Sequence, residues 1–291
     1  MVSAMLVSQA HSFAQQTRLA ITLAWIAGYT NILTVLTCGT VTSHVTGTVS
    51  QWGSDLVQGK WPALLFVSFL LATFLLGAML SSLCTETGRR RGWESIYILP
   101  MTVQAILLSA FAVGVELHEH ATIESGAMLY AMTGLASTAM GLQNATITKI
   151  SGGVVRTTHM TGVFTDFGLE TVQFLYWLRD RNKDSPPLPP RALVHSVRTH
   201  PSARRLALLA SVAGSFALGA GLGTLAFAHF PRPAMIPPTI FLLWIIYQDY
   251  RTPICEIESS ELASREAGLD LPDAIAVYHL RRGREQRQWT P

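Results

Sequence analysis

Six apolar stretches, each about as long as a membrane-crossing helix, dominate this sequence. A helix needs roughly 20 residues to cross about 30 Å of hydrocarbon. Only 13% of the residues are charged, against roughly a quarter in soluble domains, and the mean hydropathy is +0.33. The sequence therefore predicts an all-α, polytopic membrane protein. The expected transmembrane helices are 19–38, 62–84, 95–115, 125–148, 206–228 and 234–250.

A polar motif occurs twice between these stretches. Residues Thr42–Gly47 read Thr-Ser-His-Val-Thr-Gly, and Thr157–Gly162 read Thr-Thr-His-Met-Thr-Gly. When His44 is aligned with His159, the residues that follow match in register, and a Gly-x-x-Asn precedes each copy. A period of about 115 residues indicates a duplicated half-protein and not the short unit of a solenoid.

Each copy, wound as a helix, places polar and acidic side chains on one stripe, because spacings of three and four share a face. The second stripe has two carboxylates one turn apart, which repel in a low dielectric and suit proton uptake and release. We therefore expect the second half to carry the titrating group and the first half its uncharged counterpart. The stripes are His44, Gly47, Gln51 and Asp55, and His159, Gly162, Asp166 and Glu170.

The candidate site adds nearby hydrogen-bonding side chains to the stripes. A histidine in or beside hydrocarbon tends to mark a proton or substrate path, although each ring could equally tie a helix end to a neighbour. Asparagine amides suit a polar ligand, and helix-to-helix hydrogen bonding explains them equally well. The predicted substrate-binding and proton-coupling residues are His44, His159, Asp166, Asn31, Asn144, Thr46, Thr161, Gln51, Asp55 and Glu170.

No catalytic residue, metal site or cofactor is predicted. The sequence has no His-Glu-x-x-His, no Walker loop and no dinucleotide fingerprint. The net charge of +3 is modest and follows the loops, so no nucleic-acid partner is expected.

Basic residues predict the orientation of the chain. Arg89–Arg91 fill a short loop, and the link 179–205 is rich in arginine, so the positive-inside rule places both in the cytoplasm. This requires the polar motifs to be re-entrant or short polar helices that do not cross. Each half then has three spans, and a repeat with an odd number of spans lies inverted relative to its partner, as in many secondary transporters.

The expected organisation has a cytoplasmic N-terminal segment and a cytoplasmic polar tail around the two repeats. Four prolines from Asp184 to Pro190 predict a stiff, extended spacer there. Small residues at four-residue spacing, Ser211, Ser215, Gly219 and Gly223, predict a ridge that a second helix backbone can approach closely. The boundaries are 1–18 for the N-terminal segment, 19–116 for the first repeat, 125–250 for the second repeat with its cytoplasmic link 179–205, and 251–291 for the tail.

The order of these motifs resembles the YoaK-type family of bacterial multi-pass membrane proteins, catalogued as a domain of unknown function. The resemblance covers roughly residues 19–250 and implies an inner-membrane location without a settled substrate. The tail after Arg251 is an addition to the family's pattern. The residues that carry the resemblance are Gly28 and Asn31, Thr42–Gly47, Gly141–Asn144 and Val155–Gly162.

Together these features favour a secondary transporter or permease for a small polar solute, with proton coupling as one option and its site where the repeats meet. It would be a multi-pass protein of the bacterial inner membrane with both termini in the cytoplasm. Its expected partners are the lipid bilayer and the solute, and a homo-oligomer stays open.

Two alternatives remain. One is an intramembrane lipid-modifying enzyme, with His159 as general base and Asp166 as its partner. These residues are seven positions apart, roughly 10 Å along a helix, which disfavours a direct pair. The other alternative is a non-catalytic membrane scaffold.

Overall fold

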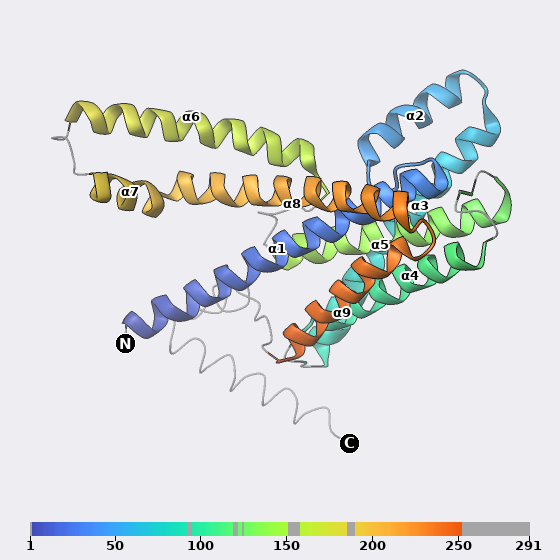
Figure 1. Ribbon diagram of the computed structural model, residues 1–291, viewed down its shortest axis with the longest axis horizontal. Coiled ribbons are helices and arrows are strands. Elements are labelled where there is room, and N and C mark those ends of the chain that lie inside the picture. The colour runs from blue at the N-terminus through green and yellow to red at the C-terminus, as the bar shows by residue number, and fades with distance from the viewer. Residues whose placement is uncertain are drawn as a thin grey trace.

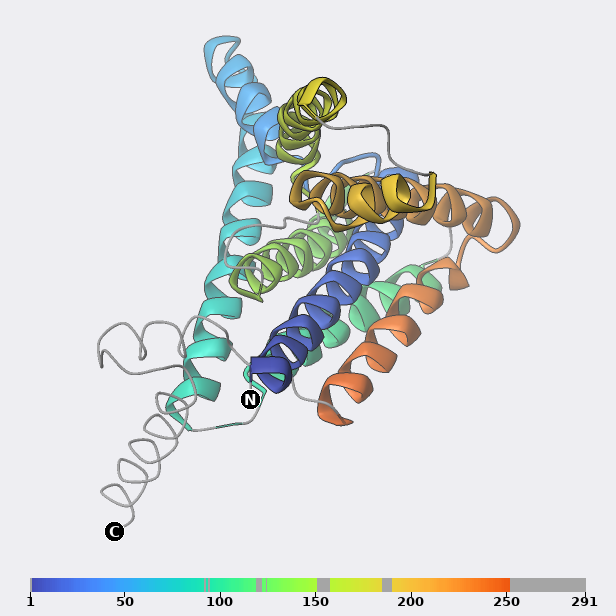
Figure 2. The same cartoon turned by 90° about the vertical axis from the view of Figure 1, so that its left-hand side faces the viewer.

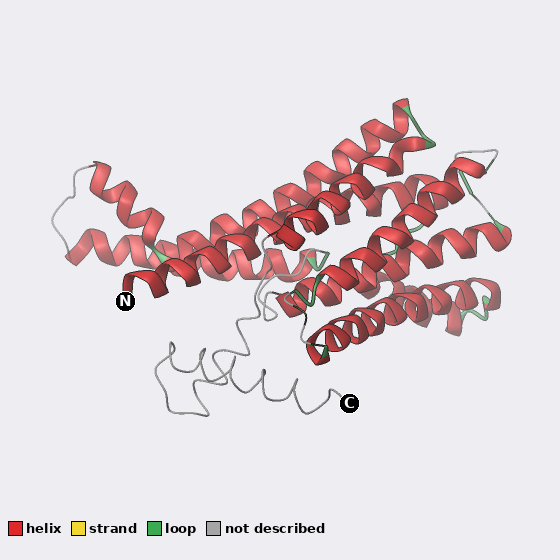
Figure 3. Cartoon of the chain, turned by 90° about the horizontal axis from the view of Figure 1, so that it is seen from below, coloured by secondary structure: helices red, strands yellow, loops and turns green. Residues whose placement is uncertain are grey.

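The computed structural model describes residues 2–91, 93, 95–118, 122–123, 125–150, 158–184 and 190–251. Throughout these residues every regular element is a helix (Figure 3). The helices are α1 (Val2–Cys38), α2 (Val45–Val57), α3 (Trp61–Arg90), α4 (Ile98–Leu117), α5 (Gly126–Ile150), α6 (Met160–Asp184), α7 (Pro190–Thr199), α8 (Pro201–His229), the short 3-10 helix η1 (Pro233–Met235) and α9 (Ile236–Arg251).

All six predicted apolar stretches form helices. Within the described residues, four helices are long and apolar enough to cross a membrane, namely α3, α4, α8 and the part of α1 from Thr17 to Cys38. The chain is thus a multi-pass membrane protein. Helix α9 has 16 residues, fewer than the roughly 20 that a span needs. Helix α5 carries polar side chains that are buried inside the bundle, including Thr133, Ser137 and Gln143.

Three segments differ from the expectations. Helix α1 begins at Val2, upstream of the predicted start at residue 19. Helix α6 continues for 25 residues to Asp184, longer than a short polar helix, and it packs on α8. The cytoplasmic link contains a helix that was not predicted, α7, which begins at Pro190, and proline is well tolerated at the first helical position. The predicted extended spacer between Asp184 and Pro190 lies outside the described residues. The tail beyond Arg251 lies outside the described residues.

Two helix pairs form the centre of the molecule, and each pairs one half of the chain with the other. Helix α1 packs along α8, and α5 packs along α3 (Figure 1). The backbones meet at glycine. A Cβ atom added to Gly28 would collide with the carbonyl oxygen of Phe216, and one added to Gly141 would collide with the carbonyl oxygen of Phe74.

The partner helices α3 and α8 also place a glycine at each crossing. A Cβ atom on Gly77 would strike the carbonyl oxygen of Thr138, and one on Gly219 would strike that of Trp25. The contacting residues of α1 and α5 differ by 113 positions in both contacts (141 minus 28, and 138 minus 25). Those of α3 and α8 differ by 142 positions in both contacts (216 minus 74, and 219 minus 77). The two crossings therefore use equivalent residues of the two halves.

The predicted small-residue ridge of α8 lies against α1. Ser215 Oγ donates a hydrogen bond to the carbonyl oxygen of Ile21 at 2.8 Å. Gly219 and Gly223 are buried, and a Cβ atom on Gly223 would lie 2.7 Å from Cγ2 of Ile32. The prediction is confirmed for these three residues.

A chain of buried amides links three helices inside the bundle. Gln104 Nε2 in α4 donates to Gln143 Oε1 in α5 at 2.5 Å, and Gln143 Nε2 donates to the carbonyl oxygen of Leu23 in α1 at 2.7 Å. Both glutamine side chains are almost fully buried. Because a polar group in an apolar interior needs a partner, these bonds fix α4, α5 and α1 relative to one another.

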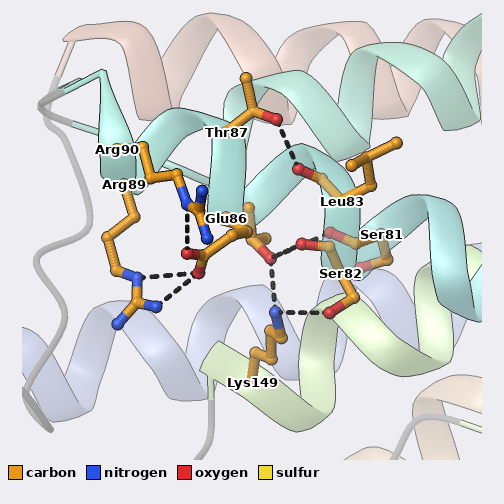
Figure 4. Close-up of polar contacts among 9 residues, drawn as sticks. Ser81, Ser82, Leu83, Glu86, Thr87, Arg89, Arg90 and Lys149 are labelled. Atoms are coloured by element: carbon orange, nitrogen blue, oxygen red, sulfur yellow. Dashed lines mark hydrogen bonds and ion pairs between the residues drawn. The ribbon is translucent and has the colours of Figure 1, made fainter.

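A second polar cluster joins the C-terminal ends of α3 and α5 (Figure 4). Lys149 Nζ of α5 donates to Thr85 Oγ1 at 2.6 Å and to Ser82 Oγ at 3.2 Å on α3. Glu86 accepts from Arg90 Nε at 2.8 Å and from Arg89 Nε at 3.0 Å. Cations near helix C-termini complement the helix dipoles, so this cluster stabilises the end of the α3–α5 pair.

Candidate functional site

The two repeated motifs lie where α2 and α6 begin. The first turns of α2 and α6 lie near each other in two perpendicular views (Figures 1 and 2), and the helices then diverge, α2 toward the right and α6 toward the left of Figure 1. Helix α2 packs on α3, and α6 packs on α8, which occupies the equivalent position in the other half. The two motifs are thus brought together by their N-terminal ends.

An asparagine holds the chain at the start of each helix. Ser43 Oγ donates to Asn31 Oδ1 at 2.8 Å, and Thr158 Oγ1 donates to Asn144 Oδ1 at 2.5 Å. With this orientation each carboxamide keeps its NH₂ group as a donor. The Gly-x-x-Asn and Ser/Thr-His parts of the repeat therefore form one structural unit in each half.

The spacing of histidine and glycine in the motif also has a structural reason. Both histidines are exposed, and each ring folds back over the first turn of its helix. A Cβ atom on Gly47 would lie 2.5 Å from His44 Nδ1, and one on Gly162 would lie 2.6 Å from His159 Nδ1. Glycine at the third position after the histidine leaves the space that the imidazole occupies.

The start of α2 has backbone donors without a side-chain cap. His44 is the N-cap residue and makes no capping hydrogen bond with its side chain. The first helical bond runs from the N–H of Thr48 to the carbonyl oxygen of His44, so the three preceding N–H groups have no acceptor within the helix. Thr46 and Thr161 are exposed on these first turns. Uncapped helix N-termini favour negatively charged or acceptor groups.

The acidic ends of the two stripes lie away from this centre. His44 and Asp55 are eleven residues apart on α2, which corresponds to about 16 Å along the axis. Asp55 is buried, with an exposed fraction of 1%, and accepts a hydrogen bond from Gln51 Nε2 at 2.8 Å on Oδ1. The ten predicted residues therefore form a central group and two outer groups, one in each half.

The second outer group contains a residue that the sequence reasoning missed. Arg205 Nη1 lies 2.8 Å from Glu170 Oε1, and Arg205 Nη2 lies 3.9 Å from Asp166 Oδ2. Glu170 is buried and the Asp166 side chain is 40% exposed. An arginine inside the first turns of an otherwise apolar helix, with acids on the preceding helix, is the signal that could have found this contact.

This arrangement differs from the expectation for the acidic residues. We expected Asp166 to titrate and the first half to hold an uncharged counterpart. Asp166 instead faces water and an arginine, whereas Asp55 of the first half is buried, and its Oδ2 accepts no hydrogen bond in the described part of the chain.

Comparison with known families agrees with the repeated motifs. A family model described as "Protein of unknown function (DUF1275)" matches residues 19–248. The chain belongs to this family. No curated protein and no solved structure matches it. The resemblance to the YoaK-type family is thereby confirmed, and the DUF1275 match includes both motifs, both asparagines and all of α1 to α8 from residue 19 onward.

The DUF1275 match ends three residues before α9 does, at residue 248. The segment from residue 252 to 291 therefore lies outside both the family match and the described residues.

Proposed function

We propose that this protein is a secondary permease for a small polar solute, built from two inverted three-span repeats. The first repeat contains α1, α3 and α4, and the second contains α5, α8 and α9. The support is the recurrence of the Gly28 and Gly141 crossings at constant sequence shifts, together with the opposite directions of α2 and α6. An inverted repeat places a solute site near the midplane between the halves.

In this proposal α5 and α9 complete the six spans. Helix α5 packs against α3, α4 and α1, so its polar side chains contact protein and not lipid. Helix α9 packs on α4 and follows η1, which adds a turn to its length. The cationic cluster at the end of α3 and the arginines of the link 179–205 then both lie in the cytoplasm, as do both termini.

In this proposal the solute binds at the first turns of α2 and α6. The site presents uncapped backbone N–H groups of α2, the exposed His44 and His159, and the amide groups of Asn31 and Asn144. These groups are chiefly donors, so a solute that bears hydrogen-bond acceptors, such as a carboxylate or a carbonyl, fits them best. The matched asparagine contacts at the two helix starts are the observation that carries the proposal.

Site-directed labelling tests this proposal. In a variant without native cysteines, Ser43→Cys and Thr158→Cys would be treated in intact cells and in inverted vesicles with a membrane-impermeant maleimide. Alternating access predicts that each cysteine reacts with the maleimide from both sides of the membrane, because the site opens to each side in turn. While the site is open to one side, the cysteines should be protected from maleimide added on the other side. Gly59→Cys, at the far end of α2, is the control, because it should react from one side only. Reaction of both test cysteines from a single side would contradict a permease.

The enzyme alternative has less support from the geometry. The ring of His159 lies against Gly162, while Asp166 Oδ2 lies 3.9 Å from Arg205 Nη2. Within the described residues, no hydrogen bond joins His159 to Asp166, as a general-base pair would need. The scaffold alternative predicts that Ser43→Cys and Thr158→Cys are inert from both sides.

A further inference from the structure

Asp55 is a buried carboxylate with an unusually poor set of partners. Its Oδ1 accepts one hydrogen bond, from Gln51, whereas Oδ2 is buried and has none within the described residues. No arginine, lysine or histidine nitrogen of the described chain lies within 4.0 Å of either oxygen. A carboxylate removed from water needs a positive charge or a proton to compensate it.

The other half of the molecule shows what compensates the equivalent group. The shift of 115 residues that aligns His44 with His159 also aligns Asp55 with Glu170, and Glu170 is paired with Arg205 at 2.8 Å. The shift of 142 residues between α3 and α8 assigns Ala63 to the position of Arg205 (205 minus 142). Alanine supplies no charge. The first half therefore lacks the cation that is built into the second.

The neighbourhood of Asp55 contains no substitute for that arginine. Helix α2 packs on α3, and the stretch of α3 from Trp61 to Thr85 has no acidic or basic residue. Lys60 precedes α3, but only its backbone N–H contacts Asp55, at the carbonyl oxygen and 2.9 Å, and its side chain is exposed. The only other ionisable residue of this helix and its cap is His44, at the opposite end.

We propose that Asp55 binds a monovalent cation from solution, H⁺ or Na⁺, in the place that the Arg205 guanidinium takes beside Glu170. This inference deepens the proposed permease, on which it rests, because it assigns the coupling-cation site to the first repeat. Exchange of a mobile cation at Asp55 would change the charge of α2 during transport, whereas the fixed pair in α6 would stay constant. The two halves would thus have different roles despite their common origin.

The test measures cation binding by the purified full-length protein without any solute. One experiment titrates Na⁺ by isothermal calorimetry at constant pH and ionic strength. The other follows the carbonyl stretch of protonated carboxyl groups by infrared difference spectroscopy as the pH changes. We expect one of the two signals in the wild type, either saturable Na⁺ binding or a protonated carboxyl band, and complete loss of that signal in Asp55→Asn.

Two further variants keep the result interpretable. Glu170→Gln is the matched control and should retain the signal, because its partner Arg205 supplies the charge. Ala63→Arg brings the missing guanidinium to Asp55 and should abolish the signal while Asp55 is still present. A signal that is absent from the wild type, that persists in Asp55→Asn, or that Ala63→Arg leaves unchanged would overturn the assignment.

The outcome of the cation-binding test can be distinguished from the outcome of the labelling test. Labelling of Ser43→Cys and Thr158→Cys from one side alone would remove the permease and leave a measured cation site at Asp55. Labelling from both sides with no Asp55-dependent signal would keep the permease and remove the cation site.

Discussion

Replacing Gly28 by alanine is expected to weaken the packing of α1 on α8. The added methyl group would overlap the carbonyl oxygen of Phe216, which belongs to the backbone of α8 and cannot rotate away. The two helices must therefore move apart along the whole crossing. Overpacking of this kind costs about 1–3 kcal/mol, while alanine in place of glycine returns up to ~1 kcal/mol of helix propensity. The net loss should be about 1–2 kcal/mol.

Combinations of glycine substitutions test the symmetry of the two crossings. Gly141→Ala should cost as much as Gly28→Ala, and the double variant Gly28→Ala/Gly141→Ala should lose about 2–4 kcal/mol, because separate crossings are additive. Gly28→Ala/Gly219→Ala should lose less than the sum of its single variants, since both residues lie in one crossing.

Unfolding in mixed micelles with an increasing fraction of SDS, followed by tryptophan fluorescence, measures these differences. Gly221→Ala on the same α8 is the control, because a Cβ atom there has no neighbour within 4 Å, and it should leave stability unchanged or raise it by up to ~1 kcal/mol. If Gly28→Ala is as stable as Gly221→Ala, the close backbone contact that we describe is refuted.

Three further predictions concern polar contacts and use the same unfolding assay. Arg205→Met should lower stability by about 1–3 kcal/mol by leaving buried Glu170 without its partner, and Arg205→Met/Glu170→Gln should recover most of the loss; a single variant Arg205→Met as stable as the wild type would show that the pair does not matter. Gln143→Leu should cost about 1 kcal/mol, from two hydrogen bonds at roughly 0.6 each, and a loss no larger than that of the outward-facing Thr224→Val would argue against the amide chain. Lys149→Met should cost less than ~1 kcal/mol, because the contact is exposed, and a larger loss would mean that Lys149 does more than join α3 to α5.

The positions of the helices could be predicted from the sequence because apolar stretches of membrane-spanning length leave little choice of structure. The ends of α4 and α5 fall within three residues of the predicted boundaries, whereas α3 ends six residues beyond its predicted end. The small-residue ridge of α8 was predictable for a related reason, since residues four apart share a face. The helical winding expected for Gly47, Gln51 and Asp55 is also confirmed, because α2 covers Val45–Val57.

The pairing of the helices was not predictable in the same way. The duplication shows that Gly28 and Gly141 are equivalent, but nothing in a single sequence assigns Phe216 to one and Phe74 to the other. Arg205 was missed because its partner Glu170 is distant in the sequence, and the buried state of Asp55 depends on the packing of α2 on α3. Contacts between distant segments can be assigned only when the fold is known, whereas helices can be predicted from the local sequence pattern.

The exchange of partners between the halves has a consequence for biosynthesis. Helix α1 leaves the ribosome long before α8 is translated. Its glycine face therefore has no partner until the last third of the protein has been synthesised. A chain cut between α4 and α5 would produce two fragments, each missing the helix against which its own first helix packs. Such fragments should be degraded when made alone and stabilised when made together. This is expected if the protein derives from a dimer in which the first helix of each subunit packed against the other subunit.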